Sequence, residues 1–190
     1  MKLIYKKGFN GNIEDLPCGE HMPNAVKFKE FSSVKTMSLF VNGIAIILFF
    51  ILYFLTKTIA RQTILTNSGI IIAVLLSLPH ELIHAICFKE TVYLYTYLRK
   101  GMLFVTGQEH MSKTRFIIMS ALPTIFFGII PFILFLINPS LKTIGTIGIL
   151  SISMGAGDFV NIFNAITQMP KGSKTYLHKL NSYWYMPEKN

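Results

Sequence analysis

The sequence has few charged side chains and only two cysteines. Charged residues make up 14% of the 190 residues and hydrophobic residues 52%, whereas about a quarter of a typical soluble domain is charged. This balance indicates a membrane protein. Cys18 lies in a polar stretch and Cys87 in an apolar one, so we expect no disulfide framework. Residues 1–30 lack an apolar central region, so we expect no cleavable signal peptide.

Acidic side chains are half as frequent as basic ones, nine against 18, which gives a net charge of +9. Such a surplus can indicate nucleic-acid binding, but the basic cytoplasmic loops of a membrane protein explain it better here. If both termini are cytoplasmic, every Lys and Arg lies on the cytoplasmic side except Lys57, Arg61 and Lys142. We therefore expect a protein of the bacterial cell membrane, with both termini cytoplasmic and no nucleic-acid partner.

Four apolar runs are long enough to cross a bilayer, which takes about 20 residues in a helix. These runs cover residues 37–56, 65–88, 116–137 and 143–166. The β-rich stretches TVYLYTYL and MLFVTG on either side of RKG predict a β-hairpin over residues 90–108. We therefore expect an all-α integral membrane fold with about four transmembrane helices and one short β-hairpin. Cytoplasmic segments 1–36 and 167–190 would flank a membrane core of residues 37–166.

The second apolar run contains the pattern H-E-x-x-H, formed by His80, Glu81 and His84. Residues four apart share one face of a helix, so both imidazoles can reach one metal ion. The pattern suits Zn2+ with Glu81 as general base, which would take a proton from a zinc-activated water and pass it to the leaving amine. A cluster that merely pairs with lipid headgroups or loop lysines is the alternative. We disfavour it because each ionisable group within an apolar span costs about 2.5–3.5 kcal/mol.

A third zinc ligand is expected from another apolar run. Asp158 is the only other acidic residue within a predicted span. It precedes the cytoplasmic end of its helix by the same number of residues as His80 does, which predicts a common depth of about 12 Å. A capping or kink-associated role for Asp158 is the alternative. Cys87 is a competing ligand, although a small buried side chain is its better-supported role.

Several neighbouring residues are candidates for supporting roles. Gly155 and Gly157 would let the fourth helix approach the motif helix closely. Asn161 would orient a ligand or bind a substrate carbonyl, or else form an interhelical hydrogen bond. Pro79 frees a backbone carbonyl and would open space for water, and Pro123 lies at a similar depth. Both prolines are also compatible with simple tolerance in a transmembrane helix.

These motifs carry a resemblance to known families. H-E-x-x-H in one helix and an Asp in a later one resemble intramembrane zinc metalloproteases of the site-2 protease type. Residues 35–166 are similar, in size, motif, hairpin-like loop and the late Gly157–Asp158 pair, to small bacterial membrane proteins classed as zincin peptidases. The resemblance implies zinc ligands at His80, His84 and Asp158 and a catalytic Glu81. The Gly-Pro-x-x-Asn element of the site-2 family is reduced to Leu122-Pro123-Thr124.

The sequence therefore predicts an intramembrane zinc metallopeptidase that acts on a peptide or membrane-protein substrate in or near the lipid bilayer. The predicted hairpin would present an extended substrate by strand addition. One alternative is a non-catalytic membrane protein that binds metal for structure or sensing. Another is a small transporter whose path includes the ionisable residues named above. No oligomeric state is predicted.

Overall fold

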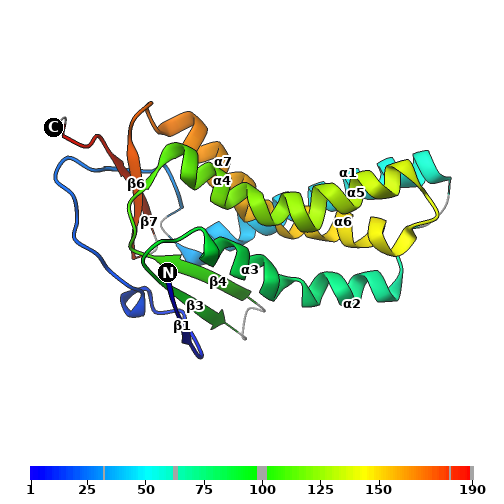
Figure 1. Cartoon of the computed structure of the whole chain (residues 1–190), viewed down its shortest axis with the longest axis horizontal. Helices are drawn as coiled ribbons and strands as arrows, with labels where there is room; N and C mark the ends of the chain where they lie inside the picture. The colour runs from blue at the N-terminus through cyan, green and yellow to red at the C-terminus, as the bar shows by residue number, and fades with distance from the viewer. Residues whose placement is uncertain (32, 62–63, 98–101, 180, 189–190) are drawn as a thin grey trace.

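The polar flanks of the chain gather at one end of a helical bundle in the computed structural model (Figure 1). The structure describes residues 1–31, 33–61, 64–97, 102–179 and 181–188. Four helical passes run along the long axis and alternate in direction. The two ends of the described chain consequently lie at the end of the molecule that carries the β-strands.

The helices follow the four apolar runs. A short 3-10 turn, η1 (Ile13–Asp15), precedes the bundle. The passes are formed by α1 (Val34–Ala60); by α2 (Asn67–Leu75) and α3 (Ser77–Ile86); by α4 (Lys113–Thr124), the π-helical η3 (Ile125–Ile129) and α5 (Ile130–Ile137); and by α6 (Lys142–Met154) and α7 (Ala156–Gln168). Ser33, Thr66 and Ser112 each accept a backbone N–H from the first turn of the helix that follows them. These capping hydroxyls explain why three of the passes begin where they do.

Three passes are long and apolar enough to cross a membrane: α1, α2 with α3, and α4 to α5. The fourth, expected as one helix over residues 143–166, consists of α6 and α7, which are bent by 49° and count as a further span only if the pair is one. Thr56 is the only buried side chain of α1, and many large apolar side chains of this helix, including Leu39, Ile47 and Phe54, are exposed. The length and composition of this apolar surface fit a bilayer.

The expectation of an all-α fold is wrong, because the chain also forms two β-sheets. The first sheet has the order β1 (Lys2–Lys6), β3 (Thr91–Tyr97) and β4 (Met102–Gly107), with β1 parallel to β3 and β3 antiparallel to β4. The second has the antiparallel order β2 (Val26–Lys27), β7 (Asn181–Tyr185), β6 (Lys174–His178) and β5 (Met111–Ser112). β3 and β4 occupy the place of the expected hairpin. The sheets are completed by strands from before α1 and after α7 and by β5, which directly precedes α4. Pairing between such distant segments leaves no local periodicity to detect.

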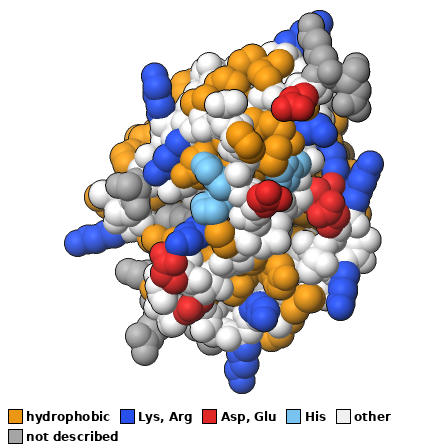
Figure 2. All heavy atoms as spheres, turned by 90° about the vertical axis from the view of Figure 1, so that its left-hand side faces the viewer, with side chains coloured by type: hydrophobic (Ala, Val, Ile, Leu, Met, Phe, Trp, Pro, Cys, Tyr) orange, Lys and Arg blue, Asp and Glu red, His pale blue; other side chains and the backbone are white. Residues whose placement is uncertain are grey.

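Two apolar clusters hold the fold together. One joins the sheet end to the helices and contains Phe28, Ala85, Phe88, Val92, Met111, Phe116, Ala165 and Met169. The other packs α5 against α6 near the opposite end and contains Ile64, Phe132, Phe135, Ile149 and Ile152. Seen end-on, the sheet end displays Lys and Arg side chains around its edge (Figure 2). The bundle therefore has one polar, basic end and a largely apolar length.

α4 and α7 approach closely at Gly155, where the fourth pass bends. A Cβ atom at Gly155 would collide with Oγ1 of Thr124, which is almost completely buried. A Cβ atom at Gly157 would have Val41 Cγ1 as its nearest neighbour, at 3.9 Å. Of the two glycines, only Gly155 is required by the helix crossing, and it fixes how close α7 comes to α4.

Gly155→Ala should therefore destabilise the protein, because Thr124 has no free space into which it can move. We expect a loss of about 1–3 kcal/mol, the usual cost of overpacking a tight contact. Thermal unfolding in detergent micelles measures the loss. Gly157→Ala is the matched control and should unfold like wild type; an equal loss in both variants would contradict the assignment.

Candidate metal centre

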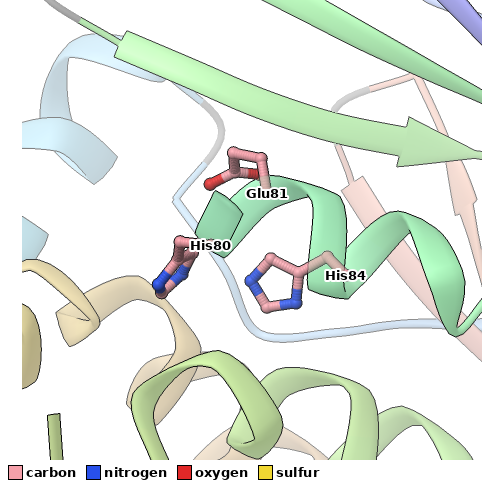
Figure 3. A group of neighbouring side chains, drawn as sticks. All are labelled: His80, Glu81 and His84. Atoms are coloured by element: carbon pink, nitrogen blue, oxygen red, sulfur yellow. The ribbon is translucent and has the colours of Figure 1, made fainter. Parts of the chain in front are cut away.

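The motif helix α3 begins inside the second pass, where a break at Leu76 separates it from α2. Pro79 lies in the first turn of α3. A helix tolerates proline there because the N–H groups of the first turn have no acceptor within the helix. His80 and His84 then face the same side, with ring centroids 4.9 Å apart. Donor atoms of His80, Glu81 and His84 all lie within 4.8 Å of one another, and Figure 3 shows the three side chains on successive turns of α3.

Asp158 reaches this cluster from the first turn of α7. Its Oδ2 lies 3.1 Å from Nε2 of His80, and its Oδ1 lies 3.2 Å from Nε2 of His84. The carboxylate therefore contacts both imidazoles at once, although more than 70 residues separate it from them in the sequence. The three side chains are largely buried, with between 10% and 15% of each exposed.

The hydrogen bonds of His84 test whether this donor set fits a cation. Nδ1 of His84 lies 3.0 Å from the carbonyl oxygen of Met119. Because a carbonyl only accepts, Nδ1 carries the proton, and Nε2 of a neutral ring then presents a lone pair to the carboxylate of Asp158. Two acceptors at 3.2 Å need a proton or a metal ion between them. Two imidazole nitrogens and a carboxylate are a ligand set typical of catalytic zinc, and the residues present fit such an ion.

Glu81 lies next to the first sheet. The main chain of Val105 in β4 lies next to its carboxylate, and Figure 3 shows its side chain beside a β-strand. Strand β4 has a partner on one side only among the strands that the structure describes. The general-base candidate thus lies at the open edge of a β-sheet.

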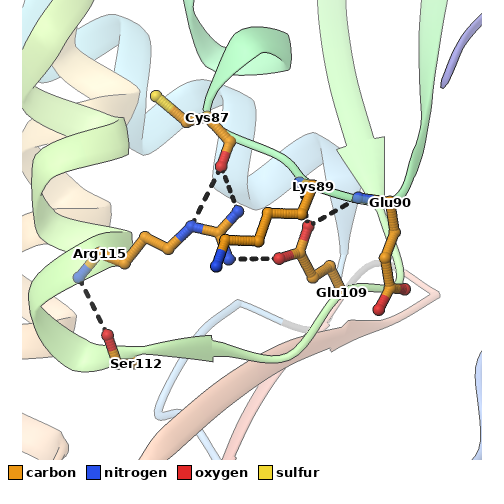
Figure 4. Close-up of polar contacts among 6 residues, drawn as sticks. All are labelled: Cys87, Lys89, Glu90, Glu109, Ser112 and Arg115. Atoms are coloured by element: carbon orange, nitrogen blue, oxygen red, sulfur yellow. Dashed lines mark hydrogen bonds and ion pairs between the residues drawn. The ribbon is translucent and has the colours of Figure 1, made fainter. Parts of the chain in front are cut away.

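A buried ion pair holds the end of the motif helix (Figure 4). The guanidinium of Arg115 donates to the carbonyl oxygen of Cys87, which follows the last residue of α3, and also to Oε1 of Glu109. Oε2 of Glu109 accepts the backbone N–H groups of Lys89 and Glu90. Burial alone would raise the pKa of Glu109, but these hydrogen bonds outweigh it and the pKa is lowered.

Lys113 donates to carbonyl oxygens at the C-terminal end of α7, as Arg115 does at the end of α3. Its Nζ donates to the carbonyl oxygens of Ile166, 3.1 Å away, and Met169, 2.6 Å away. Cations stabilise the C-terminal end of a helix and are unfavourable at the N-terminal end. The first turn of α4 therefore carries two cations, Lys113 and Arg115, that serve the C-terminal ends of α7 and α3 instead of their own helix.

The other candidates from the sequence have different surroundings. Pro123 is fully buried within α4. Asn161 is half-buried on α7, and its side chain forms no hydrogen bond with any other residue in the described part of the chain. Cys87 contributes its backbone carbonyl, not its thiol, to the network. Sequence analysis missed Met119, Lys113 and Arg115; two cations in the first turn of a helix were the one available signal.

Glu109→Gln tests the buried ion pair. A lowered pKa means that ionised Glu109 stabilises the fold at pH values above its unfolded pKa of about 4.3, and that this contribution disappears as pH falls through the lower pKa of the folded state. We expect the variant to melt below wild type at neutral pH, with the difference shrinking in acid. Melting curves recorded from about pH 3 to pH 7 measure it. Glu90→Gln, whose exposed side chain lies outside the ion pair, should melt like wild type throughout.

Comparison with known proteins adds one finding. Residues 70–174, more than half of the chain, match the model of a family described as "Putative zincin peptidase". The matched region includes both halves of the cluster, the H-E-x-x-H helix and Asp158. Comparisons with curated proteins and with solved structures give no match.

Proposed function

Because this chain belongs to the zincin peptidase family, we propose that it is an intramembrane zinc metallopeptidase. Zincin-type peptidase activity is the function that the family name suggests. The finer assignment is ours: hydrolysis of a peptide bond in or near the membrane, with Glu81 as general base. His80, His84 and Asp158 would be the metal ligands.

The contact of one carboxylate with two imidazoles carries this proposal. Asp158 meets Nε2 of both His80 and His84 at 3.1 and 3.2 Å. A helix-capping aspartate would have backbone N–H groups as its partners, and this one has ring nitrogens. Three protein ligands leave one coordination position open, as hydrolytic zinc sites require.

The surroundings of the cluster support a site within the membrane. α3 belongs to a pass long and apolar enough to cross a bilayer, and ionisable groups within such a pass mark functional sites. The sheets and both ends of the described chain lie at one end of the bundle, where basic side chains also gather. The positive-inside rule assigns that end to the cytoplasm, so both termini would be cytoplasmic and the site would open towards that side.

The chemistry that a zinc ion supplies when held by His80, His84 and Asp158 is Lewis acidity towards a carbonyl group and a water molecule. Glu81 would accept a proton from the attacking water as its oxygen adds to the scissile carbonyl carbon. The same carboxyl group would then deliver the proton to the amide nitrogen as the C–N bond breaks. The contact with Val105 restrains the Glu81 side chain on the side of the cluster that faces β4.

Glu81→Gln should abolish peptide cleavage and leave zinc binding intact, because Gln keeps the shape of the side chain but cannot take a proton. Cleavage is measured by mass spectrometry on a library of transmembrane peptides in phosphatidylethanolamine and phosphatidylglycerol liposomes, and zinc by metal analysis. His80→Ala and Asp158→Ala should lose zinc as well as cleavage, while Cys87→Ala should keep both. Retained turnover in Glu81→Gln would refute its catalytic role. Zinc binding without cleavage by wild type would favour a structural or sensing role.

The open edge of β4 suggests how a substrate is held. The main chain of Val105 lies next to Glu81 on an edge strand, and the backbone groups of Leu103, two residues earlier, face the same way as those of Val105. An extended peptide that adds to this edge would replace those contacts and lie beside Glu81. The substrate would then be an unwound segment of a peptide or membrane protein.

Leu103→Pro removes one outward N–H, and an edge strand tolerates proline at such a position. We expect cleavage to fall at least about tenfold, which corresponds to the loss of roughly one hydrogen bond, with zinc content unchanged. Leu103→Ala keeps the N–H and is the matched control. Equal cleavage by the proline and alanine variants would exclude strand addition at this edge.

A further inference from the structure

The carbonyl of Met119 has no backbone partner one turn further along α4. In an α-helix, each carbonyl accepts the N–H of the residue four positions later. For Met119 that residue is Pro123, which has no N–H to donate. The backbone ladder resumes two residues on, where Ala121 accepts the N–H of Ile125. The gap in the ladder is therefore local to Met119.

This freed carbonyl is the one that holds His84. Nδ1 of His84 lies 3.0 Å from the carbonyl oxygen of Met119, while Nε2 of the same ring faces Asp158 at 3.2 Å. His84 and Pro123 are both buried, so no bulk water is available to satisfy the carbonyl in place of the imidazole. An unpaired buried carbonyl carries a desolvation penalty, and the imidazole removes that penalty.

A second proline in the same pass provides a comparison. Pro131 lies near the start of α5, directly after the π-helical η3, and also lacks an N–H. In the described part of the chain, no side chain donates a hydrogen bond to the carbonyls one turn before it. A proline in this pass does not by itself attract an imidazole; the coincidence of a missing N–H and a facing histidine is particular to Pro123.

We propose that Pro123 is a positioning residue for the metal centre. By withholding an N–H, it leaves the Met119 carbonyl to accept the Nδ1–H of His84, which fixes the tautomer and the ring plane so that Nε2 points to the metal position. The inference deepens the proposed function, on which it rests for the role of His84 as a zinc ligand. Loss of such an outer partner typically weakens metal binding about 10- to 100-fold.

Pro123→Ala supplies the missing N–H and draws the Met119 carbonyl back into the helix ladder. We expect its zinc dissociation constant, measured by chelator competition in detergent, to rise about 10- to 100-fold. The matched control, Pro131→Ala, should bind zinc as wild type does. In metal-free protein the His84 Nδ1–H should give a slowly exchanging proton NMR signal in wild type and in Pro131→Ala, and not in Pro123→Ala.

A second variant distinguishes the loss of this hydrogen bond from a folding defect in Pro123→Ala. A backbone ester in place of the Met119–Ser120 amide weakens the carbonyl as an acceptor while Pro123 stays in place, and it should also weaken zinc binding. Wild-type zinc affinity and an unchanged Nδ1–H signal in Pro123→Ala would overturn the proposal. If wild type itself binds no zinc, the proposed function fails, whereas the NMR comparison in metal-free protein still decides the role of Pro123.

Discussion

The candidate metal centre depends on one carboxylate that contacts two imidazoles inside an apolar bundle. Ionisable side chains are costly in such surroundings unless they neutralise one another or bind an ion. Asp158 meets both rings at hydrogen-bonding distance, so the second and fourth passes must lie at matching depth and with matching rotation. A shift of α7 by one residue along its axis would move Asp158 about 1.5 Å and turn it away from the rings. The remaining contacts around the cluster can be understood as ways of preventing that shift.

α4 is the element that prevents it. From its first turn, Lys113 donates hydrogen bonds to carbonyl oxygens at the C-terminal end of α7, and Arg115 donates to the carbonyl oxygen of Cys87 at the C-terminal end of α3. One helix therefore binds the C-terminal ends of both ligand-bearing helices. One turn further, its Met119 carbonyl orients His84. Thr124 then sets the approach of α7 through the missing side chain of Gly155. The helix contributes no candidate metal ligand, and yet it contacts each element that does.

How much of this the sequence predicts depends on whether the signal is local. The H-E-x-x-H pattern and the apolar runs are local signals. The position of Asp158 as the only other acid in a predicted span is also local, and counting residues from the helix ends predicts that it lies at the same depth as His80. The parallel pairing of β1 with β3 is not local, because β1 lies before the first helix and β3 after the third. The role of Met119 could not be predicted from the sequence either, because every residue has a backbone carbonyl and nothing in the residue type marks this one. Pro123 was named only as a candidate for a supporting role, because its effect falls on a residue one turn away.

Interrupted helices explain why the cluster can lie inside the bundle at all. Both ligand-bearing helices begin in the middle of an apolar pass: α3 after the break at Leu76 and α7 after the bend at Gly155. A helix start has backbone N–H groups without intrahelical partners and the positive end of the helix dipole, which favours a carboxylate such as Asp158 in the first turn. The breaks thus create a polar layer within the apolar pass, and the imidazoles and the carboxylate occupy that layer.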